Sequence, residues 1–130
     1  MVSLLIVSHS AQLAAGVREF TSQVAGAGVQ IMDAGGTDDG ALGTSIGRIQ
    51  QALEQIASPD GTLVLVDLGS AVLSVEMAIE ALGADAKVRI SDAPLVEGAY
   101  LAALEAAAEA SLDETAAAAL QAREMVKIHS

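Results

Sequence analysis

The stretch that decides the fold is Leu4-Leu5-Ile6-Val7-Ser8-His9-Ser10, in which a continuous apolar run stops at three polar side chains. A short run that is apolar at every position predicts a strand buried on both faces, which is typical of a parallel sheet. Ser10 is a residue type favoured at helix N-caps, and a helical pattern follows it over about 11–26. One of only two histidines in the chain is therefore expected at the end of a strand, directly before a helix.

The rest of the chain repeats this alternation of strand and helix. Further strands are predicted over 29–32, 62–66 and 87–90. Further helices are predicted with N-caps at Thr44 or Ser45, at Ser70 and at Ser111, the last running to about Val126, and one more helix is predicted after Pro94. The glycines and aspartates of 33–45 predict a loop without regular structure. We therefore predict a single α/β domain over 1–130, with a doubly wound, mostly parallel open sheet and a frayed tail at about 127–130.

The composition restricts the possible partners. The chain has 6 basic and 17 acidic residues, and its net charge of −11 argues against binding to nucleic acid or to a membrane. The charge favours a basic protein partner, although solubility alone would also explain it. There is no cysteine, no basic start before the first apolar run and no apolar run of about 20 residues. We therefore expect a cytoplasmic protein with no signal peptide.

Three unusual stretches follow predicted strands and should meet at the carboxyl edge of the sheet: Ser8-His9-Ser10, the loop 33–45 and Asp67-Leu68-Gly69-Ser70. If the first and third strands are neighbours, Asp67 can accept a hydrogen bond from His9 Nδ1 and leave Nε2 as a nucleophile. A helix N-terminus beside the ring would suit a phosphoryl group. Taken singly, His9 is equally consistent with a hydrogen-bonded histidine at the end of a strand. Asp67 alone favours a turn, and Ser10 and Ser70 alone favour helix caps.

Other chemistries lack their motifs. The chain has no Gly-x4-Gly-Lys-Ser/Thr loop and no Gly-x-Ser-x-Gly elbow, and its histidines are not at metal-ligand spacing. The aspartates of the loop 33–45 do not match a calcium loop. We therefore expect neither a metal nor a cofactor.

Four stretches together resemble one known family. They are Val2 to Ser10, Gly43-Thr44 with Ile46, Asp67-Leu68-Gly69-Ser70-Ala71, and Ala93-Pro94-Leu95-Val96-Glu97-Gly98. They are similar to the DhaM family, the phosphotransferase subunits of phosphoenolpyruvate-dependent dihydroxyacetone kinases, over residues 2 to about 110. The resemblance implies a mannose-type IIA fold and a homodimer.

The resemblance also implies a phosphocarrier mechanism. His9 would take a phosphoryl group from the carrier protein HPr on Nε2, as a tele-phosphohistidine, and Asp67 would orient the ring. The group would pass to ADP held by DhaL, and the resulting ATP would phosphorylate dihydroxyacetone on DhaK. Some family members continue into HPr-like and enzyme-I-like domains; because this chain ends at 130, a separate HPr is the expected donor.

Finer expectations concern the surroundings of His9. Ser10, Gly69 and Ser70 are the expected donors to the phosphoryl oxygens, and Leu42, Gly43 and Leu68 are expected to form the rim on which partners dock. An alternative is a mannose-type IIA component of a sugar permease, although mannose transporters resemble each other in a Thr-His-Gly start and a Trp-Gly-Gly-Ser-Pro turn that this chain lacks. A catalytically silent binding module, acting through its acidic surface, is the third possibility.

Overall fold

A computed structural model describes residues 1–129 of the protein; Ser130, part of the tail predicted to be frayed, lies outside the described residues. Within them, the chain folds as one sheet with the strand order β2-β1-β3-β4, in which every pair is parallel. The strands are β1 (Ser3–Ser8), β2 (Ile31–Gly35), β3 (Thr62–Val66) and β4 (Val88–Ile90). The helices are α1 (Ala11–Ala25), α2 (Ile46–Gln55), α3 (Ser70–Leu82), α4 (Leu95–Ala107) and α5 (Leu112–Leu120). The predicted doubly wound α/β fold is confirmed.

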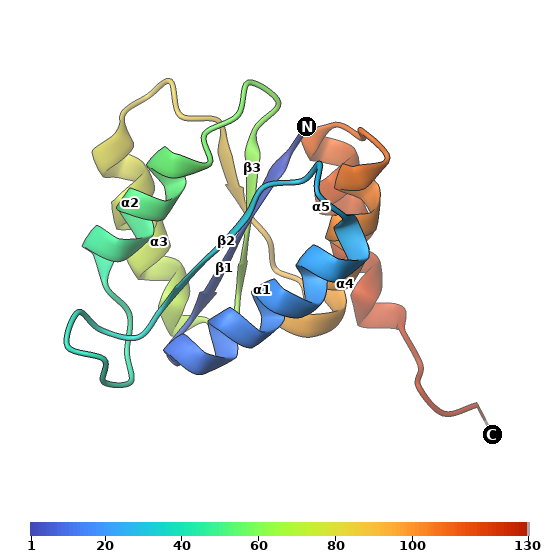
Figure 1. The fold of residues 1–130 in the computed structure, drawn as a ribbon, viewed down its shortest axis with the longest axis horizontal. Helices are drawn as coiled ribbons and strands as arrows, with labels where there is room; N and C mark the ends of the chain where they lie inside the picture. Colours follow the sequence, from blue (N-terminus) through green and yellow to red (C-terminus); the bar gives the residue numbers. More distant parts are fainter. Residues whose placement is uncertain (130) are drawn as a thin grey trace.

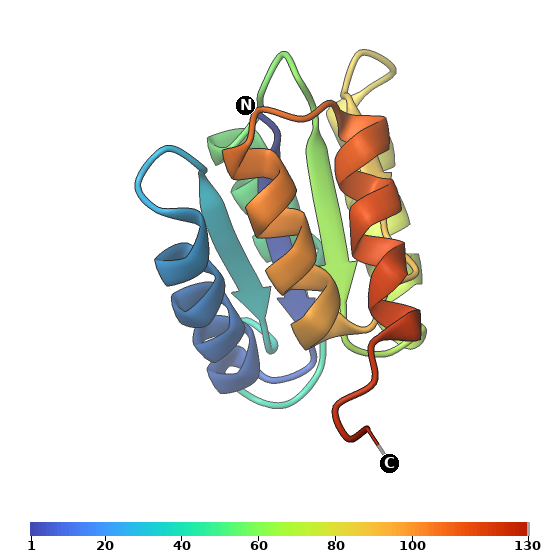
Figure 2. The same ribbon diagram turned by 90° about the vertical axis from the view of Figure 1, so that its right-hand side faces the viewer.

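Helices cover both faces of this sheet (Figure 1). On one face α1, α4 and α5 lie side by side, and on the other α2 packs against α3 (Figure 2). Each face of the sheet has its own hydrophobic core. Leu4 and Ile6 belong to the core beneath α1, α4 and α5, whereas Leu5 and Val7 belong to the core beneath α2 and α3. The stretch Leu4-Leu5-Ile6-Val7 of β1 is apolar at every position because its alternate side chains enter two different cores. None of the helices in the described part of the chain is both long and apolar enough to cross a bilayer.

The central strands β1 and β3 are direct neighbours. Their register runs from Ser3 opposite Thr62 to Val7 opposite Val66, and the Asp67 N–H continues the ladder to the Val7 carbonyl at 3.2 Å. The residues that follow each strand therefore emerge together at the carboxyl edge of the sheet, the lower edge in Figure 1. This pairing is the condition under which His9 and Asp67 were expected to meet.

The second strand differs from the prediction. It was expected over 29–32, but β2 begins at Ile31 and extends to Gly35, so part of the predicted loop is strand. The register with β1 pairs Ile6 with Asp33 and Ser8 with Gly35. These ladder hydrogen bonds to a central strand outweigh the poor strand propensity of Asp and Gly. A β-carbon at Gly35 would lie 2.5 Å from the Ser10 carbonyl oxygen, so only glycine fits beneath the start of α1.

The last helix is also shorter than predicted. It was expected to reach Val126, but α5 ends at Leu120 and continues as a 3₁₀ turn, η1 (Gln121–Glu124). Its start is as expected, because Ser111 and Glu114 form a capping box. Ser10 and Ser45 likewise cap α1 and α2 through their hydroxyl oxygens.

Candidate functional site

His9 and Asp67 form a hydrogen-bonded pair at the carboxyl edge of the sheet. His9 Nδ1 lies 3.0 Å from Asp67 Oδ1, and the two side chains are 28% and 13% exposed. Because an ionised carboxylate can only accept, Nδ1 carries a proton, and in the neutral imidazole Nε2 is then the nitrogen with the lone pair. The pair therefore holds the imidazole in the tautomer whose outer nitrogen is a nucleophile.

Three further donors converge on the carboxylate of Asp67. Its Oδ2 accepts from the His9 backbone N–H at 2.9 Å and from the Ser8 hydroxyl at 2.8 Å, and its Oδ1 accepts from the Leu68 N–H at 2.7 Å. Partial burial on its own would raise the pKa of Asp67, but these hydrogen bonds together with that from the His9 ring hold it below its ordinary value. Asp67 is thus ionised at neutral pH and fixed in one orientation.

Ser70 has a different role from the helix cap that was predicted. The N-cap of α3 is Gly69, which makes no side-chain capping bond, and Ser70 is the first residue of the helix. The Ser70 hydroxyl instead lies 2.9 Å from His9 Nε2. Since Nε2 has no proton in this tautomer, the hydroxyl donates to it. Ser70 is thus in direct contact with the outer nitrogen of His9, and its expected role as a donor to the phosphoryl oxygens stays a prediction.

Two helix N-termini flank the imidazole. The first follows His9 directly and belongs to α1, and the second belongs to α3. The first N–H groups of a helix have no acceptor within the helix and carry partial positive charge, so this arrangement favours an anion near Nε2. The Ser10 hydroxyl accepts from the Leu13 N–H at 3.2 Å, and the Ser10 N–H donates to Ser8 Oγ at 3.0 Å. These two bonds use the Ser10 N–H and the Ser10 hydroxyl oxygen. The Ser10 hydroxyl proton is not used in them and can be donated to an anion.

The loop between β2 and α2 is hydrogen-bonded both to His9 and to α3. The Gly43 N–H donates to the His9 carbonyl at 2.8 Å, and the Thr44 and Ser74 hydroxyls form a hydrogen bond of 2.7 Å. Gly43 has a φ of +139°, which a side chain would strain. Gly43 is therefore a structural contact of His9 as well as a member of the expected rim.

The expected apolar members of the rim do face solvent. Leu42 is 80% exposed and Leu68 is 61% exposed, and both belong to loops beside the pair of His9 and Asp67. Neither side chain folds back into the core. The role of Leu42 and Leu68 in docking a partner stays a prediction.

Ser8 is the residue that the sequence prediction missed. Its side chain is completely buried, donates to Asp67 and accepts from the Ser10 N–H, so it ties the carboxylate to the start of α1. The position of Ser8 in the sequence could have indicated this role. A serine that ends an otherwise apolar buried strand needs a polar partner, and the neighbouring strand ends at an aspartate.

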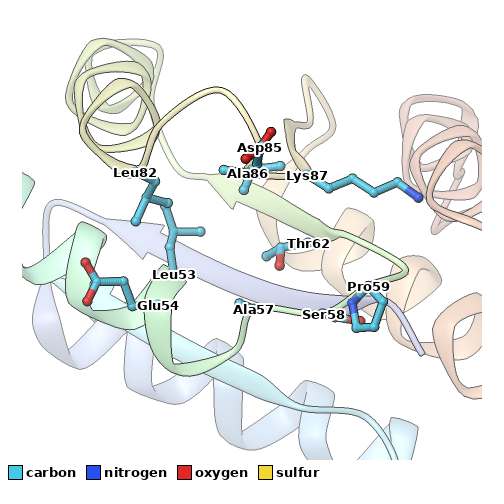
Figure 3. A pocket seen from close by; sticks show the side chains of 11 residues that line it. Leu53, Glu54, Ala57, Ser58, Pro59, Thr62, Leu82, Asp85, Ala86 and Lys87 are labelled. Carbon is cyan, nitrogen blue, oxygen red and sulfur yellow. The ribbon is translucent and has the colours of Figure 1, made fainter.

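Other features of residues 1–129 offer no competing reactive centre. They contain no group of three or more His, Cys, Asp or Glu side chains placed to hold a metal ion. A hollow of about 640 Å³ lies at the amino ends of β3 and β4, where Leu53 and Leu82 face each other and the Lys87 side chain extends away from them (Figure 3). A second hollow, of about 570 Å³, lies beside Asp67, between Leu68–Gly69 and Ser91–Pro94. Only the second adjoins the site.

Comparison with known sequences shows the family to which this chain belongs. The family described as PTS system fructose IIA component, EIIA-man, matches residues 3–116. The phosphoryl donor subunit DhaM of a PEP-dependent dihydroxyacetone kinase from Klebsiella michiganensis is 42% identical over 133 residues, and that from Escherichia coli K12 is 42% identical over 129. These alignments cover 98% and 95% of this chain but only 28% and 27% of the relatives. The chain therefore spans little more than a quarter of their length.

A shorter relative and two solved structures complete the comparison. DhaM of the PEP-dependent dihydroxyacetone kinase 2 of Listeria innocua is 39% identical over 107 residues, which cover 81% of this chain and 86% of that protein. The crystal structure of EF1359, a protein of unknown function, is 35% identical with a TM-score of 0.81, covering 93% of this chain and 95% of that one. A sigma-54 interaction domain protein from Enterococcus faecalis, 17% identical with a TM-score of 0.66 and covering 95% and 90%, shares the fold alone.

Proposed function

Because the chain belongs to the EIIA-man family of PTS fructose IIA components, we propose that it carries a phosphoryl group on His9 and transfers it between proteins. The observation that carries the proposal is the imidazole of His9, whose Nδ1 is hydrogen-bonded to Asp67 and whose Nε2 lies at the surface beside two helix N-termini. This arrangement supplies both a nucleophile and a place for the phosphoryl charge.

In the first step, the His9 Nε2 lone pair attacks phosphorus in line with the bond that holds the phosphoryl group to a histidine of phospho-HPr. The new bond joins Nε2 to phosphorus, and the bond to the donor nitrogen breaks. The proton on Nδ1 stays hydrogen-bonded to Asp67, which offsets the positive charge that develops on the ring. The product is a tele-phosphohistidine.

The Ser70 hydroxyl has to release Nε2 before this attack, because it donates to the lone pair that forms the new bond. After a small rotation, the same hydroxyl can donate to a phosphoryl oxygen. The N–H groups of Gly69 and Ser70 at the start of α3, with the Ser10 hydroxyl, complete the proposed set of donors. Ser70 would thus shield the nucleophile in the resting state and bind the transferred group afterwards.

In the second step, the phosphoryl group passes from His9 to an oxygen nucleophile of the acceptor. The DhaM relatives are phosphoryl donor subunits of dihydroxyacetone kinases, which supports ADP bound by a DhaL subunit as the acceptor. The bond from Nε2 to phosphorus breaks, a β-phosphate oxygen of ADP takes the group, and the ATP formed phosphorylates dihydroxyacetone on DhaK. A homodimer is part of this proposal.

The test is to incubate the protein with phosphoenolpyruvate, enzyme I and HPr. We expect the uptake of one phosphoryl group that is labile in acid and stable in base, and no uptake by His9→Ala. A variant of the other histidine, His129→Ala, serves as the control and should be phosphorylated normally. Uptake that persists in His9→Ala, or no uptake by the wild type, would reject the phosphocarrier.

The fructose component named in the family description favours one alternative acceptor, a IIB component of a sugar permease. The phosphorylated protein can be divided between two mixtures, one with DhaL, ADP, DhaK and dihydroxyacetone and the other with a mannose-type IIB protein. We expect rapid loss of the phosphoryl group and formation of dihydroxyacetone phosphate in the first mixture only. Discharge in the second mixture alone would assign the protein to a permease.

A further inference from the structure

The hydroxyls of Thr44 and Ser74 form a hydrogen bond of 2.7 Å between the loop that precedes α2 and the second turn of α3. Both residues are half-buried. Helix α2 does not need the Thr44 hydroxyl, because Ser45 is its N-cap and accepts from the Arg48 N–H. The Thr44 side chain is therefore available to hold α3.

Ser74 lies one helical turn after Ser70. Residues four positions apart project from the same side of a helix, so both hydroxyls extend from one side of α3. The first lies 2.9 Å from His9 Nε2 and the second contacts Thr44. At a rise of about 1.5 Å per residue, the two serines are about 6 Å apart along the helix axis. A rotation of α3 that breaks the contact with Thr44 would therefore also move the Ser70 hydroxyl away from the ring.

The loop that carries Thr44 is itself fixed to His9. The Gly43 N–H donates to the His9 carbonyl at 2.8 Å. Within the loop, Thr37 and Ala41 are joined by bonds from each backbone N–H, one to the Ala41 carbonyl at 2.9 Å and one to Thr37 Oγ1 at 3.1 Å. A closed circuit of contacts thus leaves the His9 backbone, passes through this loop to α3 and returns to the His9 ring. The loop sets the position of α3 relative to the residue that reacts.

The start of α3 has no side-chain cap that would fix its first turn. Its N-cap is Gly69, and the first turn is closed by backbone bonds of 3.0 Å from Ala71 to Leu68 and from Val72 to Gly69. A helix terminus without a capping side chain is held less firmly than a capped one. A contact one turn further along the helix therefore contributes to holding the uncapped turn in place.

We propose that Thr44 and Ser74 are positioning residues of the phosphoryl transfer, whose hydrogen bond holds the Ser70 hydroxyl within reach of the phosphoryl group on His9. This inference rests on the proposed phosphocarrier function. Phosphorylation of Nε2 breaks the bond between Nε2 and Ser70, whereas the bond between Thr44 and Ser74 persists and keeps α3 beside the ring. Because a displacement of about 1 Å can slow a reaction about 100-fold, a bond that sets this position affects the rate of transfer.

The test measures transfer from phospho-HPr to Thr44→Val and to Ser74→Ala. We expect kcat to fall about tenfold in each variant, with the KM within about twofold of wild type, because the hydrogen bond places a group at the reacting atoms and does not bind the donor. Since both substitutions break the same bond, the double variant should be no slower than either single variant. Thr44→Ser keeps the hydroxyl and should transfer at the wild-type rate.

Two further variants separate positioning from a general loss of structure. Ser70→Ala should itself lower kcat, and in that background Ser74→Ala should have less than a twofold effect, because the pair acts through the Ser70 hydroxyl. Ser45→Ala is the matched control, since the Ser45 hydroxyl bonds to Asp38 and to the Arg48 N–H and not to α3. It should lower the Tm through loss of the α2 cap and leave kcat within about twofold of wild type.

Other results overturn the inference. A normal kcat in both Thr44→Val and Ser74→Ala means that their bond does not act in transfer. A full tenfold loss by Ser74→Ala in the Ser70→Ala background means that the pair does not act through Ser70. If Ser45→Ala is as slow as Thr44→Val, or if Thr44→Ser restores nothing, the integrity of the loop matters and the hydrogen bond does not. Absence of phosphorylation in the wild type rejects the phosphocarrier itself and is thus distinguishable from these outcomes.

Discussion

Asp67 holds His9 at two points, accepting from the ring Nδ1 at 3.0 Å and from the backbone N–H of the same residue at 2.9 Å. The two bonds fix both the rotation of the imidazole and the position of its backbone. Ser8 and Leu68 hold the carboxylate itself by one bond each. The reactive nitrogen is therefore oriented by a rigid group that lies at the end of the neighbouring strand.

The substitution Asp67→Asn should slow phosphorylation of His9 by about 10- to 100-fold, because an amide no longer favours one tautomer of the ring. The rate of phosphoryl uptake from phospho-HPr measures the effect, and nitrogen NMR of the imidazole reports the tautomer. Asp92→Asn is the matched control, since Asp92 is an exposed aspartate that pairs with Arg123 and does not contact His9. A normal rate and tautomer in Asp67→Asn would contradict the role assigned to the carboxylate.

The lowered pKa of Asp67 predicts a dependence of stability on pH. Since the folded pKa is below the unfolded value of about 3.9, Asp67 contributes its full stabilisation above that value and loses it as the pH falls through the folded pKa. In a His9→Ala background, which removes the titration of the ring, the difference between Asp67 and Asp67→Asn should be constant above about pH 5 and shrink below about pH 4. Urea denaturation from pH 3 to 7 measures it. A difference that grows on acidification would contradict this sign.

Ser8→Ala should lower the free energy of unfolding by about 1–3 kcal/mol and slow phosphorylation about tenfold or more, because Asp67 loses a donor and the Ser10 N–H loses its acceptor. Ser3→Ala is the control. Ser3 is also a buried serine of β1, but its hydroxyl bonds to the Ile56 carbonyl and the Thr62 hydroxyl, away from the site. Both variants should lose stability and only Ser8→Ala should lose activity. Equal rates in the two would show that Ser8 acts only in folding.

Gly35→Ala should destabilise the protein by about 1–3 kcal/mol, because the new methyl group would lie 2.5 Å from the Ser10 carbonyl oxygen and force the start of α1 away from β2. Gly47→Ala provides the contrast. Gly47 lies inside α2 with no atom closer than 3.9 Å to an added β-carbon, so alanine should stabilise this helix by about 0.5–1 kcal/mol. Thermal and urea denaturation distinguish the two signs, and a stabilising Gly35→Ala would disprove the close approach.

Thr115→Val should leave stability unchanged or raise it by up to about 1 kcal/mol. The Thr115 hydroxyl is the buried side-chain group for which residues 1–129 supply no hydrogen-bond partner. Thr21→Val is the matched case, because the equally buried Thr21 hydroxyl donates to the Val17 carbonyl at 2.7 Å, and its loss should cost about 1 kcal/mol. If Thr115→Val destabilised the protein as much as Thr21→Val, the Thr115 hydroxyl would have a partner after all.

Much of the fold could be predicted because its signals are local. The strand Thr62–Val66 has the predicted bounds, and the N-caps Ser10, Ser45 and Ser111 act as expected, since apolar runs and capping side chains act within a few residues. The end of β2 was missed because its last residues are held by ladder bonds to β1. That stabilisation comes from a strand more than twenty residues away and leaves no local pattern.

The stretch Ser8-His9-Ser10 by itself determined that a histidine lies between a buried strand and a helix, and the resemblance of its surroundings indicated phosphoryl chemistry. Only the tertiary structure decided how its neighbours act on it. Ser70 has the side chain of a helix cap, but the pairing of β1 with β3 brings α3 against the ring, and its hydroxyl bonds to Nε2 instead. The same pairing buries Ser8 beside Asp67. A hydroxyl binds the polar group that packing brings nearest, and in this protein that group lies about sixty residues away in the chain.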